Sequence, residues 1–226
     1  MSLPVIVRLG PFMNFRSIFS VLSAAFLFAS VPAVSSATPG VLSPADPLVT
    51  VAPDGSTETC TLGFLFSGPD GYARGVTAAH CGKVDQKVST TNSQAVGTIT
   101  AHDKDDVALI DINTKLKVFG KIPGVGDIRG AITPAEINRV QPVLCKRGIA
   151  SGLMCGRLTE VAKDGFFVMS GGSIRGDSGS PVWAVSDDGS LLAAGIVSGV
   201  MDDETGDAFV IPIAPYMRQW GLTISG

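Results

Sequence analysis

Residues 176–181 read Gly-Asp-Ser-Gly-Ser-Pro and place a single serine, Ser178, between two glycines. Glycine lets the backbone approach a ligand closely, and successive N–H groups in such a turn can converge on one point. Taken alone, this stretch is an ordinary Gly/Ser turn. It gains meaning from two earlier stretches, Thr-Ala-Ala-His-Cys-Gly at 77–82 and Asp-Asp-Val-Ala-Leu-Ile at 105–110.

Together the three stretches supply one residue for each role in acyl transfer by a serine. His80 follows an apolar strand, and a neutral imidazole can accept the Ser178 proton near pH 7. Asp106 directly precedes an apolar run and can hold the imidazole in one tautomer. The backbone amides of Gly176 and Ser178 are candidate donors to the oxyanion of a tetrahedral intermediate. The sequence therefore predicts a catalytic triad.

The rest of the chain has the pattern of a β-rich protein. Short apolar or alternating runs end in Gly, Pro, Asn or Asp, and Asp-Gly turns at 70–71, 164–165 and 188–189 are typical of hairpins. We expect one helix, at 213–220. Strands are predicted at 62–66, 73–78, 87–89, 95–101, 107–112, 143–146, 155–161, 165–169, 181–184, 191–198 and 208–211.

In the order His, Asp, Ser, the motifs TAAHC, DDVALI and GDSGSP resemble those of the chymotrypsin-like serine peptidases. The stretches at 59–64 (TCTLGF) and 145–156 are similar to the compact bacterial branch, the streptogrisin and α-lytic-like peptidases. The resemblance implies His80 as general base, Asp106 as its orienter and Ser178 as nucleophile.

The same resemblance implies an all-β fold of two six-stranded antiparallel β-barrels with a short C-terminal helix. We expect a peptidase domain at 60–226, preceded by an N-terminal extension at 38–59. The first barrel would span about 60–119 and the second about 142–226, with a Gly/Pro-rich link at about 120–141.

The substrate pocket also follows from the resemblance. Ser198 and Gly199 match the strand that lines the cleft, and Val200 stands where many members have glycine. Gly172 takes the place of an acid at the pocket floor. Because a branched side chain at the mouth shortens the pocket, we expect a small or medium aliphatic residue before the scissile bond.

A basic residue near Cys145 can pair with the acid before the nucleophile in the compact bacterial branch. Lys146 or Arg147 is then expected to bind Asp177, the alternative being that both bases are simply solvated. His102 has no counterpart role, and we interpret it as a surface or turn residue.

Residues 1–37 are typical of a secretory signal. A basic residue precedes an uncharged apolar run at 18–34, and Ser35 and Ala37 suit the small-residue positions before a cleavage site. A retained membrane anchor is the alternative, because a run of this length is at the short edge of a spanning helix.

Four cysteines fit the oxidising compartment that a signal implies. Of the three possible connectivities, Cys60–Cys81 with Cys145–Cys155 is the simplest, since each pair flanks one predicted hairpin or turn. A four-cysteine metal site is the alternative, but the sequence has no C-x-x-C or C-x-x-H spacing. We therefore expect no metal and no cofactor.

Composition limits the partners. Only 16% of residues are charged, and 27 Gly and 14 Pro disfavour a coiled coil or helical bundle. A net charge of −3 without a Lys/Arg-rich run disfavours nucleic acid and anionic membranes. We expect a secreted, monomeric serine endopeptidase that acts on proteins or peptides, has no stable membrane span after signal cleavage, and either diffuses freely or associates with the cell wall. The alternatives are a non-catalytic binding protein of the same fold and an esterase with the same triad.

Overall fold

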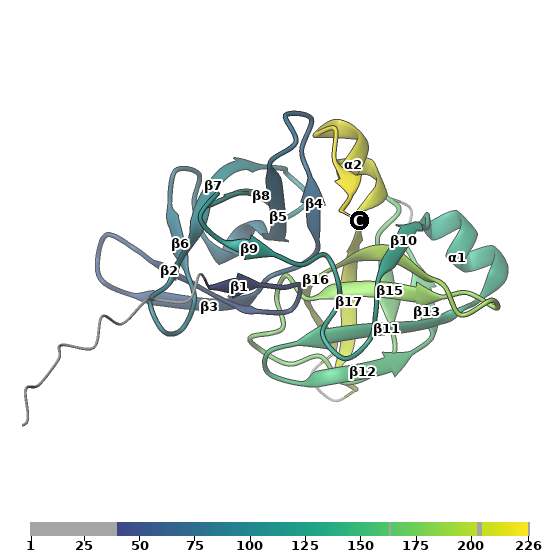
Figure 1. The fold of residues 1–226 in the computed structure, drawn as a ribbon. Coiled ribbons are helices and arrows are strands. Elements are labelled where there is room, and N and C mark those ends of the chain that lie inside the picture. The colour runs from purple at the N-terminus through teal and green to yellow at the C-terminus, as the bar shows by residue number, and fades with distance from the viewer. Residues whose placement is uncertain (1–39, 163, 203–204, 226) are drawn as a thin grey trace, which may run out of the picture. The chain divides into compact units, whose positions relative to one another are not determined.

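The structure is a computed structural model that describes residues 40–162, 164–202 and 205–225 (Figure 1). The predicted signal at 1–37 lies outside the described residues. Within the described part of the chain, no helix is both long enough and apolar enough to cross a membrane. Two large sheets, built mostly from antiparallel strands, account for the architecture, so the all-β prediction is confirmed.

The first sheet closes into a barrel because one of its segments bends. β3 pairs with β2, whereas β4, which follows after a three-residue break, pairs with β5. With β3 and β4 counted as one bent strand, the circuit has six strands, and β18 (Thr223–Ile224) adds to its edge at β4. The six strands are β2 (Pro47–Val51), β3 (Thr57–Thr61) with β4 (Leu65–Ser67), β5 (Ala73–Ala78), β6 (Lys87–Ser89), β7 (Ala95–His102) and β8 (Val107–Ile112).

Gly63 lies at this bend and has no room for a side chain. A Cβ there would lie 2.8 Å from the carbonyl oxygen of Val76 and 2.9 Å from that of Gly179. The Gly63 amide donates to the Val76 carbonyl at 2.7 Å, so the chain stays bonded to β5 through the break. Inside the barrel, buried side chains such as Ile99 and Ile110 pack together from strands whose alternate residues face inward.

The second sheet closes in the same way. β12 pairs with β11, while β13, one residue further along, pairs with β14. Counting β12 and β13 as one bent strand again gives six, and β10 (Ile128–Ala131) runs parallel to β16 at the side. The strands are β11 (Val143–Gly148), β12 (Gly152–Gly156) with β13 (Leu158–Val161), β14 (Phe167–Met169), β15 (Pro181–Val185), β16 (Leu191–Asp202) and β17 (Asp207–Pro212).

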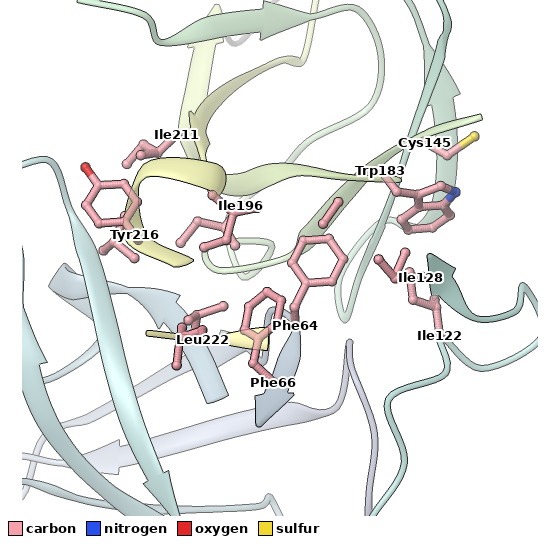
Figure 2. Packing of buried hydrophobic residues seen from close by; sticks show 14 residues of the cluster. Phe64, Phe66, Ile122, Ile128, Cys145, Trp183, Ile196, Ile211, Tyr216 and Leu222 are labelled. Carbon is pink, nitrogen blue, oxygen red and sulfur yellow. The ribbon is translucent and has the colours of Figure 1, made fainter. Parts of the chain in front are cut away.

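A shared apolar cluster joins the two barrels (Figure 2). Phe64 and Phe66 project from the first barrel, with ring centroids 5.8 Å apart. They meet Trp183 and Ile196 of the second barrel and Tyr216 of the C-terminal helix α2 (Ala214–Gln219). Since full burial of one large apolar side chain contributes about 1.5–3 kcal/mol, this cluster holds the two barrels in one relative position.

The link at 120–141 is more ordered than its sequence suggested. It contains β10 and a seven-residue helix, α1 (Pro134–Val140), which the strand-dominated pattern did not predict. Thr133 and Glu136 form a capping box around the start of α1, with Pro134 in its first turn. This arrangement is a recognised helix-start signal, so the sequence did carry the information.

The N-terminal extension also contributes to the fold. β1 (Val41–Leu42) runs parallel to β9 (Lys117–Val118), and β2 is a full member of the first barrel. The barrel therefore begins at Pro47 rather than at residue 60. Residues 47–51 alternate half-buried with buried positions before the last, exposed one, as a strand with one inward face requires. The predicted C-terminal helix is confirmed in α2.

Both disulfides are those that local pairing predicted. Cys60–Cys81 ties β3 to a short 3-10 helix at Ala79–Cys81, and Cys145–Cys155 ties β11 to β12. The first of these bridges anchors the helix that carries His80. By chain-entropy arithmetic, each bridge contributes about 3 kcal/mol to the free energy of unfolding.

Candidate active site

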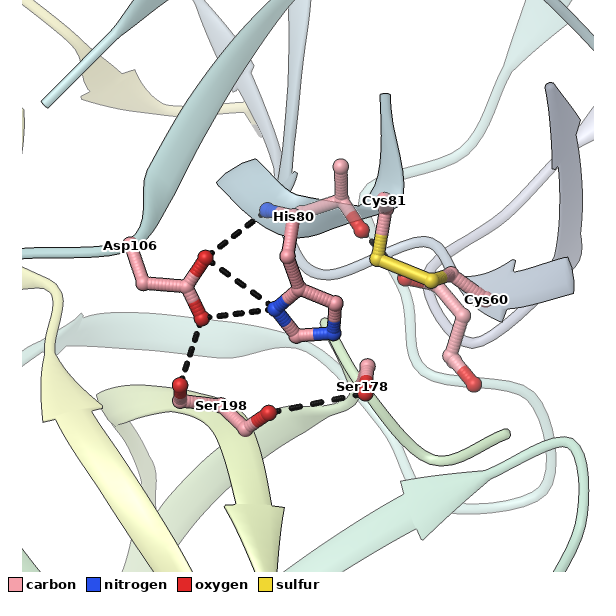
Figure 3. Close-up of polar contacts among 8 residues, drawn as sticks. Cys60, His80, Cys81, Asp106, Ser178 and Ser198 are labelled. Atoms are coloured by element: carbon pink, nitrogen blue, oxygen red, sulfur yellow. Dashed lines mark hydrogen bonds and ion pairs between the residues drawn. A yellow bond between two sulfur atoms is a disulfide. The ribbon is translucent and has the colours of Figure 1, made fainter. Parts of the chain in front are cut away.

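His80 stands on the 3-10 helix that follows β5, with the disulfide of Cys81 directly beside it (Figure 3). Two hydrogen bonds donated by backbone amides hold this turn against Asp106. The Ala79 amide donates to the Asp106 carbonyl at 3.0 Å, and the His80 amide donates to Oδ1 of the Asp106 carboxylate at 2.8 Å. The side chain of His80 remains 44% exposed, so its ring can meet a ligand.

Asp106 ends a turn before β8 and has a positive φ of 67°. Aspartate tolerates this left-handed conformation better than most residues do. The turn is tied to helix α2, because the Tyr216 hydroxyl donates to Oδ2 of Asp105 at 2.9 Å. Burial, followed by this hydrogen bond, raises the pKa of Tyr216 well above its ordinary value, so Tyr216 remains a donor.

The carboxylate of Asp106 fixes the imidazole of His80. Nδ1 lies 2.8 Å from Oδ2 and 3.1 Å from Oδ1, and the Ser198 hydroxyl donates to the same Oδ2. A proton on Nδ1 satisfies this pairing and leaves the lone pair of Nε2 free on the opposite side of the ring. Figure 3 shows that opposite side turned toward Ser178.

The two side chains of this pair shift each other's pKa. The hydrogen bond to Asp106 raises the pKa of His80 above its ordinary value, although burial works in the other direction. Burial alone would raise the pKa of Asp106, but the hydrogen bonds from His80 and Ser198 outweigh it and lower that pKa. Asp106 therefore stays ionised and stabilises a protonated imidazole.

Ser178 lies on the loop between β14 and β15, half-buried below the imidazole ring. Its hydroxyl is directed to the carbonyl oxygen of Ser198, 3.5 Å away, rather than bonded to His80. A hydrogen bond between nucleophile and base commonly tightens only when substrate binds, so this geometry is compatible with proton transfer.

Thr61 of β3 organises the loop around Ser178. Its amide donates to the Ser178 carbonyl at 2.8 Å, and its hydroxyl donates to the Gly176 carbonyl at 3.0 Å. Both carbonyls thus point to Thr61, while the amides of Gly176 and Ser178 have no acceptor among the described residues. Gly176 and Gly179 have φ values of 103° and 87°, and a Cβ on Gly179 would lie 2.2 Å from the Thr61 carbonyl oxygen. Glycine is therefore required at this contact.

Asp177 forms a buried ion pair with Lys146. Nζ lies 2.9 Å from Oδ2, and neither side chain has any exposed surface. The carboxylate also accepts hydrogen bonds from the amides of Ala150, Ser151 and Ile174, each at 3.1 Å. Burial would raise the pKa of Asp177, but the Ser151 side chain, Lys146 and the Ile174 amide outweigh it and lower that pKa. Lys146, and not its neighbour, is therefore the base that meets Asp177.

Arg147, the other candidate, points elsewhere. Its guanidinium donates to the carbonyl of Pro123 at 3.0 Å. His102, at the end of β7, is exposed, as expected of a surface residue.

A cleft of about 340 Å³ runs past the hydroxyl of Ser178. Gly199 and Val200 line it, as the sequence predicted, whereas Ser198 acts through its hydroxyl and carbonyl groups next to it. Gly172, predicted at the pocket floor, is not among the residues that line this cleft. It has a φ of 69°, and a Cβ there would collide with the side chain of Met154. The residues around the cleft are Glu58, His80, Ser173, Ile174, Arg175, Gly176, Ser178, Val197, Gly199 and Val200.

Two residues of this region are not predicted by the sequence pattern. Ser173 is buried in the cleft wall, and its hydroxyl has no hydrogen-bond partner among the described residues. Its position beside Gly172 could have suggested it. Met154 comes from a distant strand and carries no local signal.

One group of side chains has the spacing of metal ligands within the described ranges. Cys60, His80 and Cys81 offer atoms within 4.8 Å of one another. Both sulfurs are consumed by the disulfide between them, so neither is a thiolate that could bind an ion.

No family model matches the chain. Among curated proteins, the uncharacterized proteins Rv1815 and MT1863 of Mycobacterium tuberculosis are each 28% identical to it over 218 residues, covering 86% of this chain and 87% of theirs. Among solved structures, Thermobifida fusca protease A has a TM-score of 0.64 at 22% identity, covering 82% of this chain and 98% of its own.

Two further solved structures have similar scores. Cellulomonas bogoriensis chymotrypsin has a TM-score of 0.63 at 20% identity, covering 82% of this chain and 98% of its own. Nocardiopsis protease has a TM-score of 0.61 at 21% identity, covering 82% of this chain and all of its own. These neighbours are bacterial chymotrypsin-like serine proteases, and the chain has the fold of that family, as its motifs predicted.

Proposed function

We propose that this chain is a serine endopeptidase that hydrolyses peptide bonds through Ser178, His80 and Asp106. The observation that carries the proposal is the fixed imidazole of His80. Its Nδ1 lies 2.8 Å from the Asp106 carboxylate, and the opposite edge of the ring is turned toward Ser178. A scaffold that had lost catalysis would not need this arrangement, which is the geometry by which such triads are recognised.

The mechanism follows from the contacts. Nε2 of His80 removes the Ser178 proton as Oγ attacks the scissile carbonyl, and Asp106 stabilises the imidazolium that forms. The amides of Gly176 and Ser178 donate to the oxyanion of the tetrahedral intermediate. His80 then gives its proton to the leaving amine, which departs and leaves an acyl-enzyme on Ser178. Water, deprotonated by the same imidazole, releases the acid.

Substrate preference is proposed from the cleft. Val200 lines it, and the Met154 side chain occupies the space next to Gly172. The one acid among the residues that line the cleft is Glu58, which is exposed. Asp207 does not line the cleft, and its carboxylate accepts a hydrogen bond from the Gly171 amide. These features favour a small or medium aliphatic residue before the scissile bond, and predominant cleavage after Lys or Arg would refute this preference.

Export is part of the same proposal. Both disulfides suit an oxidising compartment, in agreement with the signal predicted at 1–37. We propose a secreted monomer that acts on proteins or peptides without a cofactor.

A fluorophosphonate probe tests the proposed function directly, because it labels only an activated serine. Labelling of the wild type and its loss in Ser178→Ala are expected, whereas an unlabelled wild type would favour the alternative of a binding protein. Digestion of a peptide library then separates a peptidase from an esterase. Turnover of esters without any peptide cleavage would favour the esterase.

A further inference from the structure

A second cleft, of about 410 Å³, adjoins the one at Ser178. Its walls come from the β2–β3 hairpin, the 3-10 helix of His80 and the loop that follows that helix. Glu58 and His80 are the residues that line both clefts. The two clefts are therefore neighbours that meet at Glu58 and His80, and the place where they meet is called the junction below.

The chemistry of acyl transfer assigns a direction to these clefts. The first contains Ser178 and the Gly176 amide, so it holds the acyl half of the substrate. His80 protonates the leaving amine, so the peptide after the scissile bond must start at the imidazole and continue away from Ser178. The second cleft begins at His80 and contains no residue of the Ser178 loop. The half of the substrate that follows the scissile bond would therefore lie in the second cleft.

Glu58 places a negative charge at the junction. Its side chain is exposed, and among the described residues it has neither an ion pair nor a hydrogen bond. Its charge reaches the imidazole, because Glu58 is one of the groups that raise the pKa of His80, after the hydrogen bond to Asp106. Two cations lie nearby: Lys83 lines only the second cleft, and Arg175 lines only the first. Neither of them forms an ion pair with Glu58.

We propose that Glu58 selects substrates with a basic side chain, Lys or Arg, at the first residue after the scissile bond. This inference rests on the proposed peptidase function and deepens it by naming a substrate class. An exposed ion pair changes kcat/KM by about twofold to fivefold at low salt, and the preference should weaken as ionic strength rises.

The test uses peptides that differ in one residue, Lys or Glu, directly after the scissile bond. The wild type should cleave the Lys peptide with the higher kcat/KM, Glu58→Gln should lose the preference, and Glu58→Lys should reverse it. The ratio between the two peptides is the readout, because a changed pKa of His80 affects both peptides equally. Glu160→Gln, an exposed acid on β13 that lines neither cleft, removes the same charge and should keep the wild-type ratio.

A peptidyl ester with a small alcohol leaving group separates the two proposals, since it has no residue in the second cleft. Unchanged peptide ratios in Glu58→Lys, with ester turnover intact, would overturn the role of Glu58. A second pair of peptides carries the Lys or Glu at the second residue after the scissile bond. If Glu58→Lys changes the kcat/KM ratio of this second pair only, the assigned position would be overturned. A wild type that neither turns over the ester nor reacts with the fluorophosphonate probe would instead overturn the peptidase function.

Discussion

Replacement of Lys146 by Met removes the positive partner of Asp177 while keeping a side chain of similar length. Because neither member of the pair has exposed surface, the carboxylate is left as a buried, uncompensated charge. Breaking a buried pair in this way costs about 3–5 kcal/mol of unfolding free energy. Three amide N–H groups still donate to Asp177, so we expect a loss near the lower end, about 3 kcal/mol.

Urea unfolding followed by fluorescence measures this loss, and Arg147→Met is its matched control. Arg147 is the neighbouring base on β11, and its one contact with a described carbonyl is that to Pro123. We expect Arg147→Met to lose about 1 kcal/mol or less. Equal losses for the two variants would refute the reasoning that burial of the pair, and not charge alone, stabilises the Ser178 loop.

The pH dependence of the same comparison provides a second check. The pKa of Asp177 is lowered in the folded protein, so its contribution to stability is present above the unfolded pKa and is lost as pH falls through the folded pKa. Lys146→Met removes one of the groups that lower the pKa of Asp177. The stability difference between wild type and Lys146→Met should therefore narrow on acidification, and a gap that is constant with pH would contradict the linkage.

Three further outcomes are expected. Thr61→Val removes the hydroxyl that holds the Gly176 carbonyl, so it should lower kcat with little change in KM and cost about 1–3 kcal/mol of stability, while Thr61→Ser should restore kcat. Ser198→Ala removes a hydrogen bond to the Asp106 carboxylate and should lower kcat/KM on an ester substrate by about tenfold, and an unchanged value would show that the contact is dispensable. Because the pKa of His80 is raised and the base must be neutral, kcat/KM should rise with pH through a midpoint above 6.5, and a midpoint below 6.5 in a pH–rate profile would contradict this.

Much of the site could be predicted from local sequence. His80, Asp106 and Ser178 each lie next to an apolar strand that can be read from a few residues, and their order along the chain excludes other triad architectures. Both disulfides were predictable because each closes a short segment, with sequence separations of 21 and 10.

Two elements of the structure, α1 and β2, differ from the sequence prediction for reasons that can be identified. The strand-dominated pattern does not predict helix α1, although Thr133 and Glu136 carry a capping-box signal, because the helix is only seven residues long and lies in a Gly/Pro-rich link. The sequence places β2 in an N-terminal extension, because its barrel partners, β3 and β6, are not apparent from its own five residues.

By itself, the sequence determined which residue can take each chemical role, because those roles depend on residue type and on immediate neighbours. Only the tertiary structure decided between Lys146 and Arg147. Adjacent residues of a strand face opposite sides, and which side is buried depends on the rest of the barrel. Likewise, Thr61 meets Gly176 across a sequence separation of 115 residues, a contact that exists only once both barrels have closed and packed together.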